Sequence, residues 1–132
     1  MEEYKGKVRL VVKHAPYPYR DYAKLAARAS LAAAEQGAFW PMHDLMLQNY
    51  RKLDPKSLLE YARSLNLDLN RFQKDLDSAR FADRVEEDVK LARSLDIYQT
   101  PTFVINGRTV VVNGRITSER PGRALRGPGY RR

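Results

Sequence analysis

Alternating apolar and polar residues at the front of the chain predict a β-strand at residues 7–13. Val8, Leu10 and Val12 fall on one face of this segment, and two basic residues lie on the other. A period of two residues is typical of a half-buried strand. Residues 14–19 contain two prolines, each of which lacks a backbone N–H, so they predict an irregular connection after the strand.

Apolar residues then recur every three or four positions, which predicts a run of helices. Start and stop signals divide the run into five expected helices, at 22–36, 39–50, 55–65, 69–76 and 79–95. Three aspartates, Asp21, Asp54 and Asp68, are the expected N-caps, because a carboxylate accepts the free N–H groups of a first helical turn.

Residues that accept the left-handed backbone conformation are expected to end three of these helices. Gly37, Asn66 and Asp96 each follow the last apolar position of a helical stretch. The helices between them are expected to bury one face each. The alanines of the first helix should allow close approach to a sheet, and the second helix should bury Phe39, Met42, Met46 and Tyr50. The acidic residues Asp83, Glu86, Glu87 and Asp88 are expected on the solvated face of the last helix.

Two β-rich runs, 102–105 and 109–112, lie on either side of Asn106 and Gly107. Asn-Gly is the preferred pair of a type I′ hairpin, because both residues tolerate positive φ. The expected order is therefore strand, five helices and an antiparallel hairpin. This order predicts an α/β fold with a small three-strand sheet.

The absence of cysteine from the chain excludes several kinds of chemistry. With no cysteine among 132 residues, the chain has no disulfide, no thiolate nucleophile and no thiolate metal site. His14 and His43 fall in different expected elements, and each is interpreted as a structural residue. We also find no glycine-rich phosphate loop and no nucleophile elbow. The sequence therefore predicts no catalytic residue, no metal and no cofactor.

The net charge of +8 is concentrated at one end of the chain. Residues 115–132 hold six arginines and one glutamate, a net charge of +5, whereas residues 1–114 carry +3. A basic tail on a nearly balanced domain is weak evidence for nucleic-acid binding. We therefore expect a largely irregular basic tail, with phosphate contacts as the less favoured alternative to an incidental tail.

Targeting signals are missing from the sequence. No apolar run approaches the roughly 18 residues of a membrane span, and residues 1–7 include acidic residues rather than the apolar core of a signal peptide. The sequence therefore favours either a cytosolic chain or part of a longer protein whose targeting sequence lies elsewhere.

Three motifs resemble one known family. The segment 99–107, Gln-Thr-Pro-Thr-Phe-Val-Ile-Asn-Gly, is similar to the cis-proline hairpin of thioredoxin-fold proteins. Residues 39–44 and 65–68 resemble the helical insertion of the DsbA-like branch of that superfamily. The resemblance runs from about residue 4 to residue 114. It implies an incomplete thioredoxin-like fold with a DsbA-type helical insertion at 1–114, followed by the tail at 115–132.

The resemblance also implies a binding site at Thr100 and Pro101. In such folds this proline is cis, and the backbone before it pairs with an extended substrate peptide, a form of strand addition. The family carries out thiol–disulfide exchange on extracytoplasmic proteins, which suggests a periplasmic or other extracytoplasmic location. The Cys-x-x-Cys segment of the family would precede residue 1, so this cysteine-free chain is expected to be redox-inactive.

Without that front segment, the expected strands at 7–13 and 102–105 would have unpaired edges. Three interpretations follow: the chain is part of a longer enzyme, its two strands pair with each other in a reduced sheet, or it forms a homo-oligomer through its strand edges. The functional alternatives are a peptide-binding or self-assembling domain and, more weakly, nucleic-acid binding by the tail. Two further groups of residues are candidates for a binding role. Tyr17, Tyr19 and Tyr22 are expected to cover a core edge, with a peptide groove as the alternative, and Trp40, Met42 and His43 are expected to pack together.

Overall fold

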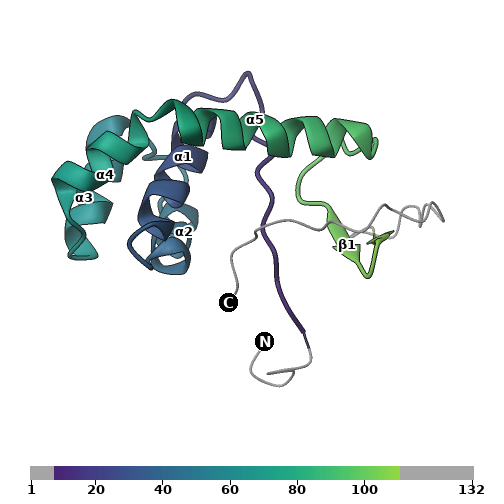
Figure 1. The fold of residues 1–132 in the computed structure, drawn as a ribbon, viewed down its shortest axis with the longest axis horizontal. Coiled ribbons are helices and arrows are strands. Elements are labelled where there is room, and N and C mark those ends of the chain that lie inside the picture. Colours follow the sequence, from purple (N-terminus) through teal and green to yellow (C-terminus); the bar gives the residue numbers. More distant parts are fainter. Residues whose placement is uncertain (1–7, 111–132) are drawn as a thin grey trace.

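The computed structural model describes residues 8–110, which form five helices followed by a small β-hairpin (Figure 1). The helices are α1 (Ala23–Ala34), α2 (Phe39–Gln48), α3 (Pro55–Ser64), α4 (Leu69–Leu76) and α5 (Ala79–Ser94), and the strands are β1 (Phe103–Ile105) and β2 (Arg108–Val110). All five expected helices are confirmed, and their ends differ from the expected ones by at most two residues. The predicted tail at 115–132 lies outside the described residues.

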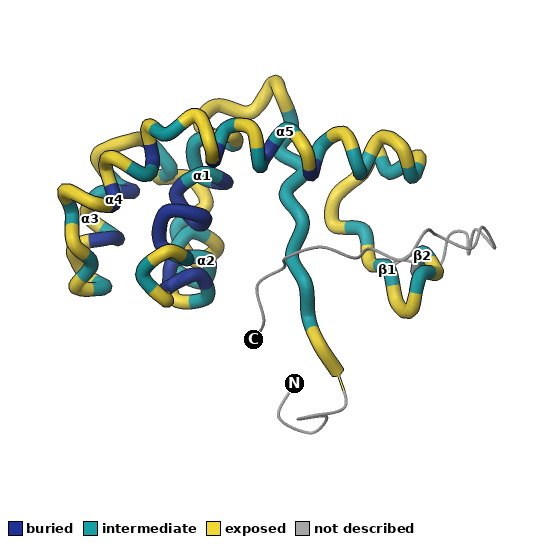
Figure 2. The backbone as a smooth tube through the Cα atoms, in the orientation of Figure 1, coloured by how far each residue is buried: buried dark blue, intermediate teal, exposed yellow. Residues whose placement is uncertain are grey.

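Helix α1 is the centre of the helical layer and contacts each of the other four helices. Its residues Ala29, Ala32 and Ala33 are fully buried, and their small side chains let the neighbouring helices approach closely. Figure 2 shows a buried stretch along α1. The alanine face thus packs on helices. The prediction that it packs on a sheet is wrong. The largest buried side chains around it come from every helix: Leu31, Met42, Leu58, Phe72 and Val85. Tyr50 was wrongly assigned to this core, because α2 ends before it and leaves it 64% exposed.

Local capping signals fix most of the helix ends. The carboxylates of Asp54 and Asp68 accept the backbone N–H groups of Ser57 at 3.1 Å and Arg71 at 2.9 Å, as the sequence predicts. The hydroxyl of Ser78 accepts the backbone N–H of Arg80 at the start of α5. The sequence pattern did not predict this cap. The left-handed helix exits are confirmed by φ values of +74° at Gly37, +56° at Asn66 and +56° at Asp96.

The start of α1 differs from the prediction. Its N-cap is Tyr22, with φ of 62° and no capping side chain, and not Asp21. The Arg20 carbonyl accepts the N–H of Ala23 at 3.2 Å, so the preceding turn carries the chain past Asp21 before the helix begins. The backbone geometry of the turn, and not the side chain of Asp21, therefore determines where α1 begins.

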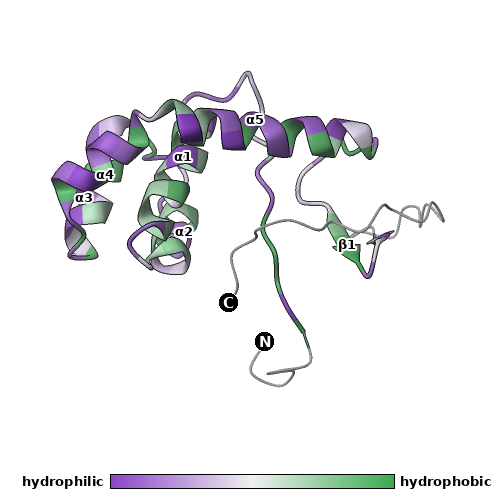
Figure 3. Ribbon diagram, viewed as in Figure 1, coloured by the Kyte–Doolittle hydropathy of each residue, from purple (hydrophilic) through white to green (hydrophobic). Residues whose placement is uncertain are grey.

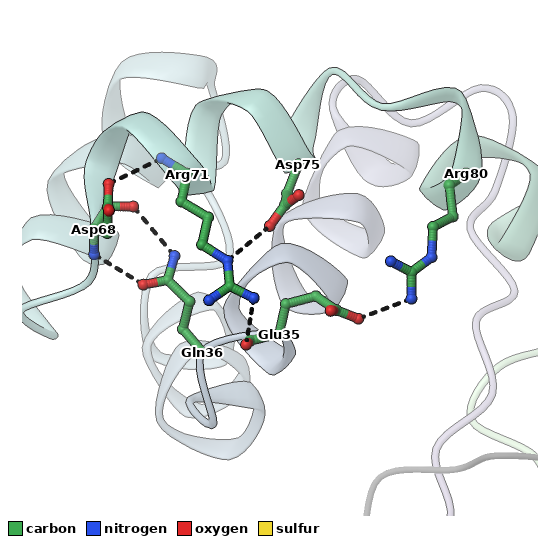
Figure 4. A network of polar contacts seen from close by, with 6 residues as sticks. All are labelled: Glu35, Gln36, Asp68, Arg71, Asp75 and Arg80. Atoms are coloured by element: carbon green, nitrogen blue, oxygen red, sulfur yellow. Dashed lines mark hydrogen bonds and ion pairs between the residues drawn. The ribbon is translucent and has the colours of Figure 1, made fainter.

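A polar network joins the end of α1 to α4 and α5 (Figure 4). The Gln36 side chain donates to the carbonyl of Asp68 at 3.1 Å and accepts its N–H at 2.8 Å. Arg71 donates to the backbone carbonyl of Glu35 at 3.1 Å, and Arg80 donates to the Glu35 carboxylate at 3.1 Å. These exposed contacts link α4 and α5 to the end of α1.

The hairpin forms as the sequence predicts. Its register pairs Phe103 with Val110, Val104 with Thr109 and Ile105 with Arg108. Positive φ values of 49° at Asn106 and 81° at Gly107 match a two-residue type I′ turn. The expected second strand, 109–112, lies partly outside the described residues.

The prediction of a first strand at residues 7–13 is wrong for the part that the structure describes. The described part of 7–13 is extended but has no strand assignment, and the sheet in residues 8–110 has two strands and not three. A strand needs a neighbouring backbone with which to exchange hydrogen bonds, and this segment instead makes its polar contacts with α5. Figure 3 shows apolar residues along both this segment and β1. None of the helices in residues 8–110 is long and apolar enough to cross a membrane.

Candidate functional site

The end of α5 places the loop that carries Thr100 and Pro101. The N–H of Asp96 donates to the carbonyl of Arg93 at 3.1 Å, and the N–H of Ile97 donates to the carbonyl of Ala92 at 2.9 Å. With Asp96 in the left-handed conformation, these bonds close the last helical turn and direct the chain away from the helix axis. The loop at 98–101 is exposed throughout its length.

The bond between Thr100 and Pro101 is cis, as the sequence analysis expected. Both residues are exposed. The hydroxyl of Thr102 donates to the carbonyl of Gln99, so one backbone acceptor beside the cis bond is engaged within the loop. The structure therefore presents Thr100 and Pro101 at the surface, with one residue between them and β1.

Tyr17 contacts this loop from the other end of the chain. Its hydroxyl oxygen accepts the backbone N–H of Thr100 at 2.9 Å, across 83 positions of sequence. This donated hydrogen bond lowers the pKa of Tyr17 below its ordinary value, because it favours the phenolate. The Tyr17 ring stacks on that of Tyr19, with centroids 5.2 Å apart. The exposed rings of Tyr19 and Tyr22 do not cover a core edge, so that expectation is wrong for both.

A buried carboxylate anchors the segment from which Tyr17 projects. Asp88, 4% exposed, accepts a hydrogen bond from Lys13 Nζ at 2.9 Å and another from the backbone N–H of His14 at 3.0 Å. The prediction that Asp88 faces solvent is wrong. The spacing of Phe81, Val85 and Asp88 places all three on one helix face, and that spacing is the signal that the sequence analysis missed.

The imidazole of His14 lies against the same layer. Its Nε2 is 3.3 Å from the hydroxyl oxygen of Ser30. Burial lowers the pKa of His14 from 6.5 to about 4, and the nearby Asp88 carboxylate only partly offsets this. Asp88 accepts the backbone N–H of His14, and Ser30 is buried and donates its hydroxyl hydrogen to the carbonyl of Ala27 at 2.7 Å. This cluster therefore anchors the chain and does not form a nucleophile with its base.

The aromatic residues of α2 pack together, as expected. The rings of Phe39 and Trp40 are 5.1 Å apart in an edge arrangement, and His43 lies 5.5 Å from Trp40 and 5.9 Å from Phe39. Met42 beside them is fully buried. Among residues 8–110 no group of three histidine, aspartate or glutamate side chains is arranged to hold a metal ion.

Comparison with known proteins identifies the family. The family model described as Thioredoxin matches residues 1–125. The chain belongs to the thioredoxin family. The resemblance to its DsbA-like branch is thereby confirmed, in a chain without cysteine. No solved structure matches the chain.

Curated relatives are named as antiporters. Na(+)/H(+) antiporter NhaA 3 of Salinispora tropica is 49% identical over 102 residues, which cover 76% of this chain and 16% of that protein. Antiporter NhaA 1 of Salinispora arenicola is 47% identical over 102 residues, and NhaA of Herminiimonas arsenicoxydans is 43% identical over 101 residues, with the same coverage of both chains. The matched region is thus about a sixth of each relative's length.

Proposed function

We propose that this chain is a redox-inactive thioredoxin-family domain that binds extended protein segments. Thiol–disulfide exchange requires a thiolate that attacks a disulfide, and the chain has no cysteine. What remains of the family's apparatus is the surface that faces a peptide, centred on Thr100 and Pro101. Extended segments bind such surfaces by adding a strand to a free sheet edge.

The observation that carries the proposal is that, among residues 8–110, β1 pairs with β2 alone and has no strand neighbour on its outer edge. In a two-residue hairpin, Ile105 and Arg108 form the hydrogen-bonded pair next to the turn. Pairing alternates along the strand, so the N–H and C=O of Val104 point away from β2. The exposed Thr100–Pro101 loop lies one residue before this strand in the sequence. A peptide strand can therefore pair with Val104 without disturbing the hairpin.

Val104→Pro tests the edge directly. Proline removes the outward N–H and fits an edge strand, so β1 and β2 should stay paired. We expect the variant to bind a blocked peptide of alternating threonine and valine about fivefold or more weakly than the wild type. Fluorescence anisotropy of the labelled peptide measures the affinity. Val104→Ala, which shortens the same side chain but keeps the N–H, is the control. Equal affinity of the two variants would contradict edge binding.

A second copy of the chain is the competing occupant of this edge. Phe103 and Ile105 are 46% and 59% exposed on the same face of β1, which favours self-association. Light scattering of the wild type and of Val104→Pro separates the two occupants. Concentration-dependent dimers that Val104→Pro abolishes would favour self-assembly, whereas monomers in both would leave the peptide as the occupant.

The relatives favour a second role, alongside an antiporter. Proteins named Na(+)/H(+) antiporters carry a region up to 49% identical to this chain. We propose that the domain works with an antiporter, and that the extended segment which it binds belongs to that assembly.

A further inference from the structure

The amide that a bound strand would use is already occupied. Thr100 precedes the outer edge of β1, and a strand that pairs with it would place a carbonyl oxygen on its N–H. The structure has the hydroxyl oxygen of Tyr17 at that position, 2.9 Å from the Thr100 nitrogen. A side-chain oxygen thus takes the place of a peptide carbonyl.

The position of Tyr17 is fixed by its surroundings. Pro16 and Pro18 flank it and restrict the backbone on both sides. The carbonyl of Tyr17 accepts the N–H of Arg20 at 3.2 Å, and its ring stacks on Tyr19. Three residues before Tyr17, the backbone N–H of His14 donates to the carboxylate of Asp88. The phenol is therefore directed at Thr100 from an anchored segment.

The contact itself is weak enough to be displaced. It is one hydrogen bond at the surface, and Thr100 is exposed. Rotation of the Tyr17 side chain, with loss of its stacking on Tyr19, would release the amide. The backbone contacts that anchor the segment would stay in place. No movement of β1 or α5 is required.

We propose that Tyr17 is an internal competitor for the peptide-binding edge. An incoming strand must replace the Tyr17 hydroxyl with its own carbonyl, so Tyr17 lowers affinity for strands that pair poorly and favours those that also engage the edge at Val104. This inference rests on the proposed function and assigns a regulatory contact to the same site.

Tyr17→Phe tests the inference, because it removes the hydroxyl and keeps the ring. We expect the variant to bind the blocked threonine–valine peptide about two- to tenfold more tightly than the wild type, as the loss of one competing hydrogen bond implies. Tyr17→Leu should show the same direction. Tyr19→Phe is the matched control, because it removes a neighbouring hydroxyl and should leave the affinity unchanged.

A measurement without peptide checks the contact separately. The temperature coefficient of the Thr100 amide shift in NMR should indicate a hydrogen-bonded N–H in the wild type and in Tyr19→Phe, and a solvent-facing one in Tyr17→Phe. If the amide is released and affinity stays equal, or falls, Tyr17 is no competitor and the inference is overturned while peptide binding stands. If no variant binds peptide, including those with a released amide, the proposed function fails and the inference falls with it.

Discussion

Two side chains hold residues far apart in sequence at the candidate site. Asp88 bonds to Lys13 and His14, 75 and 74 positions earlier, and Tyr17 bonds to Thr100. A hydrogen bond between neutral groups at the surface contributes about 1 kcal/mol to stability, whereas a buried carboxylate must be paired. Asp88 is therefore the stronger anchor, and Tyr17 is the contact that can open.

His14 makes the stability of the anchored segment depend on pH. Its pKa falls from 6.5 to about 4 on folding, mainly through burial. The unfolded chain therefore binds more protons between these two pH values. The contribution of His14 is complete above pH 6.5 and is lost as the pH falls towards 4.

We expect this contribution to be on the order of 2 kcal/mol, because the ring keeps some solvent contact. Urea unfolding between pH 4.5 and 7.5 measures it, with His14→Gln as the comparison. The wild type should lose more stability on acidification than the variant does. Parallel curves for the two proteins would show that His14 does not titrate as described.

At the scale of elements, single residues end the helices. Gly37 ends α1 with φ of +74°, and the N–H of Ala38 then bonds to the carbonyl of Ala33 at 2.9 Å. A Cβ placed on Gly37 would meet nothing within 4 Å. A side chain therefore fits in space, and its cost lies in the backbone conformation alone.

Gly37→Ala should consequently lower the free energy of unfolding by about 1 kcal/mol, the typical penalty for a left-handed non-glycine residue. Chemical denaturation measures the loss. Asn66→Gly is the complementary variant, because glycine relieves the same strain at φ of +56° and should be neutral or slightly stabilising. A loss of several kcal/mol in Gly37→Ala would contradict a purely conformational cost.

At the scale of the whole molecule, the helical layer has a shared core and the hairpin does not. The buried apolar residues come from α1 to α5 and from Ala38 between α1 and α2, whereas the β1 residues Phe103 and Ile105 are exposed. Within residues 8–110, β1 thus has a strand neighbour on one side only and carries exposed apolar side chains. We expect the proposed peptide and antiporter partners to cover this exposed apolar surface.

The antiporter proposal predicts what accompanies the chain in its source organism. An antibody against this domain should recover antiporter sequence, either in the same polypeptide or in a bound one, and intact mass with peptide sequencing distinguishes the two. An unrelated antibody is the control. Recovery of a 15.2 kDa protein without antiporter peptides would contradict the proposal.

The sequence by itself determined the five helices, the helix exits and the hairpin turn. The local signals act through bonds and backbone preferences within a few residues, so they need no tertiary context. They are Asp54 with Pro55, Gly37, and Asn106 with Gly107. The same locality explains the motif at Thr100 and Pro101, which the chain carries in one short stretch.

Tertiary structure decided the rest. The alternation at 7–13 predicts a strand, but a strand exists only with a paired neighbour, which residues 8–110 do not supply. Asp88 is a buried anchor because a basic side chain and a backbone N–H, 75 and 74 positions earlier in the sequence, donate to it. Tyr17 reaches Thr100 only because α5 and the anchored segment bring the two together. Contacts between distant residues depend on how elements pack, and a local pattern does not contain that information.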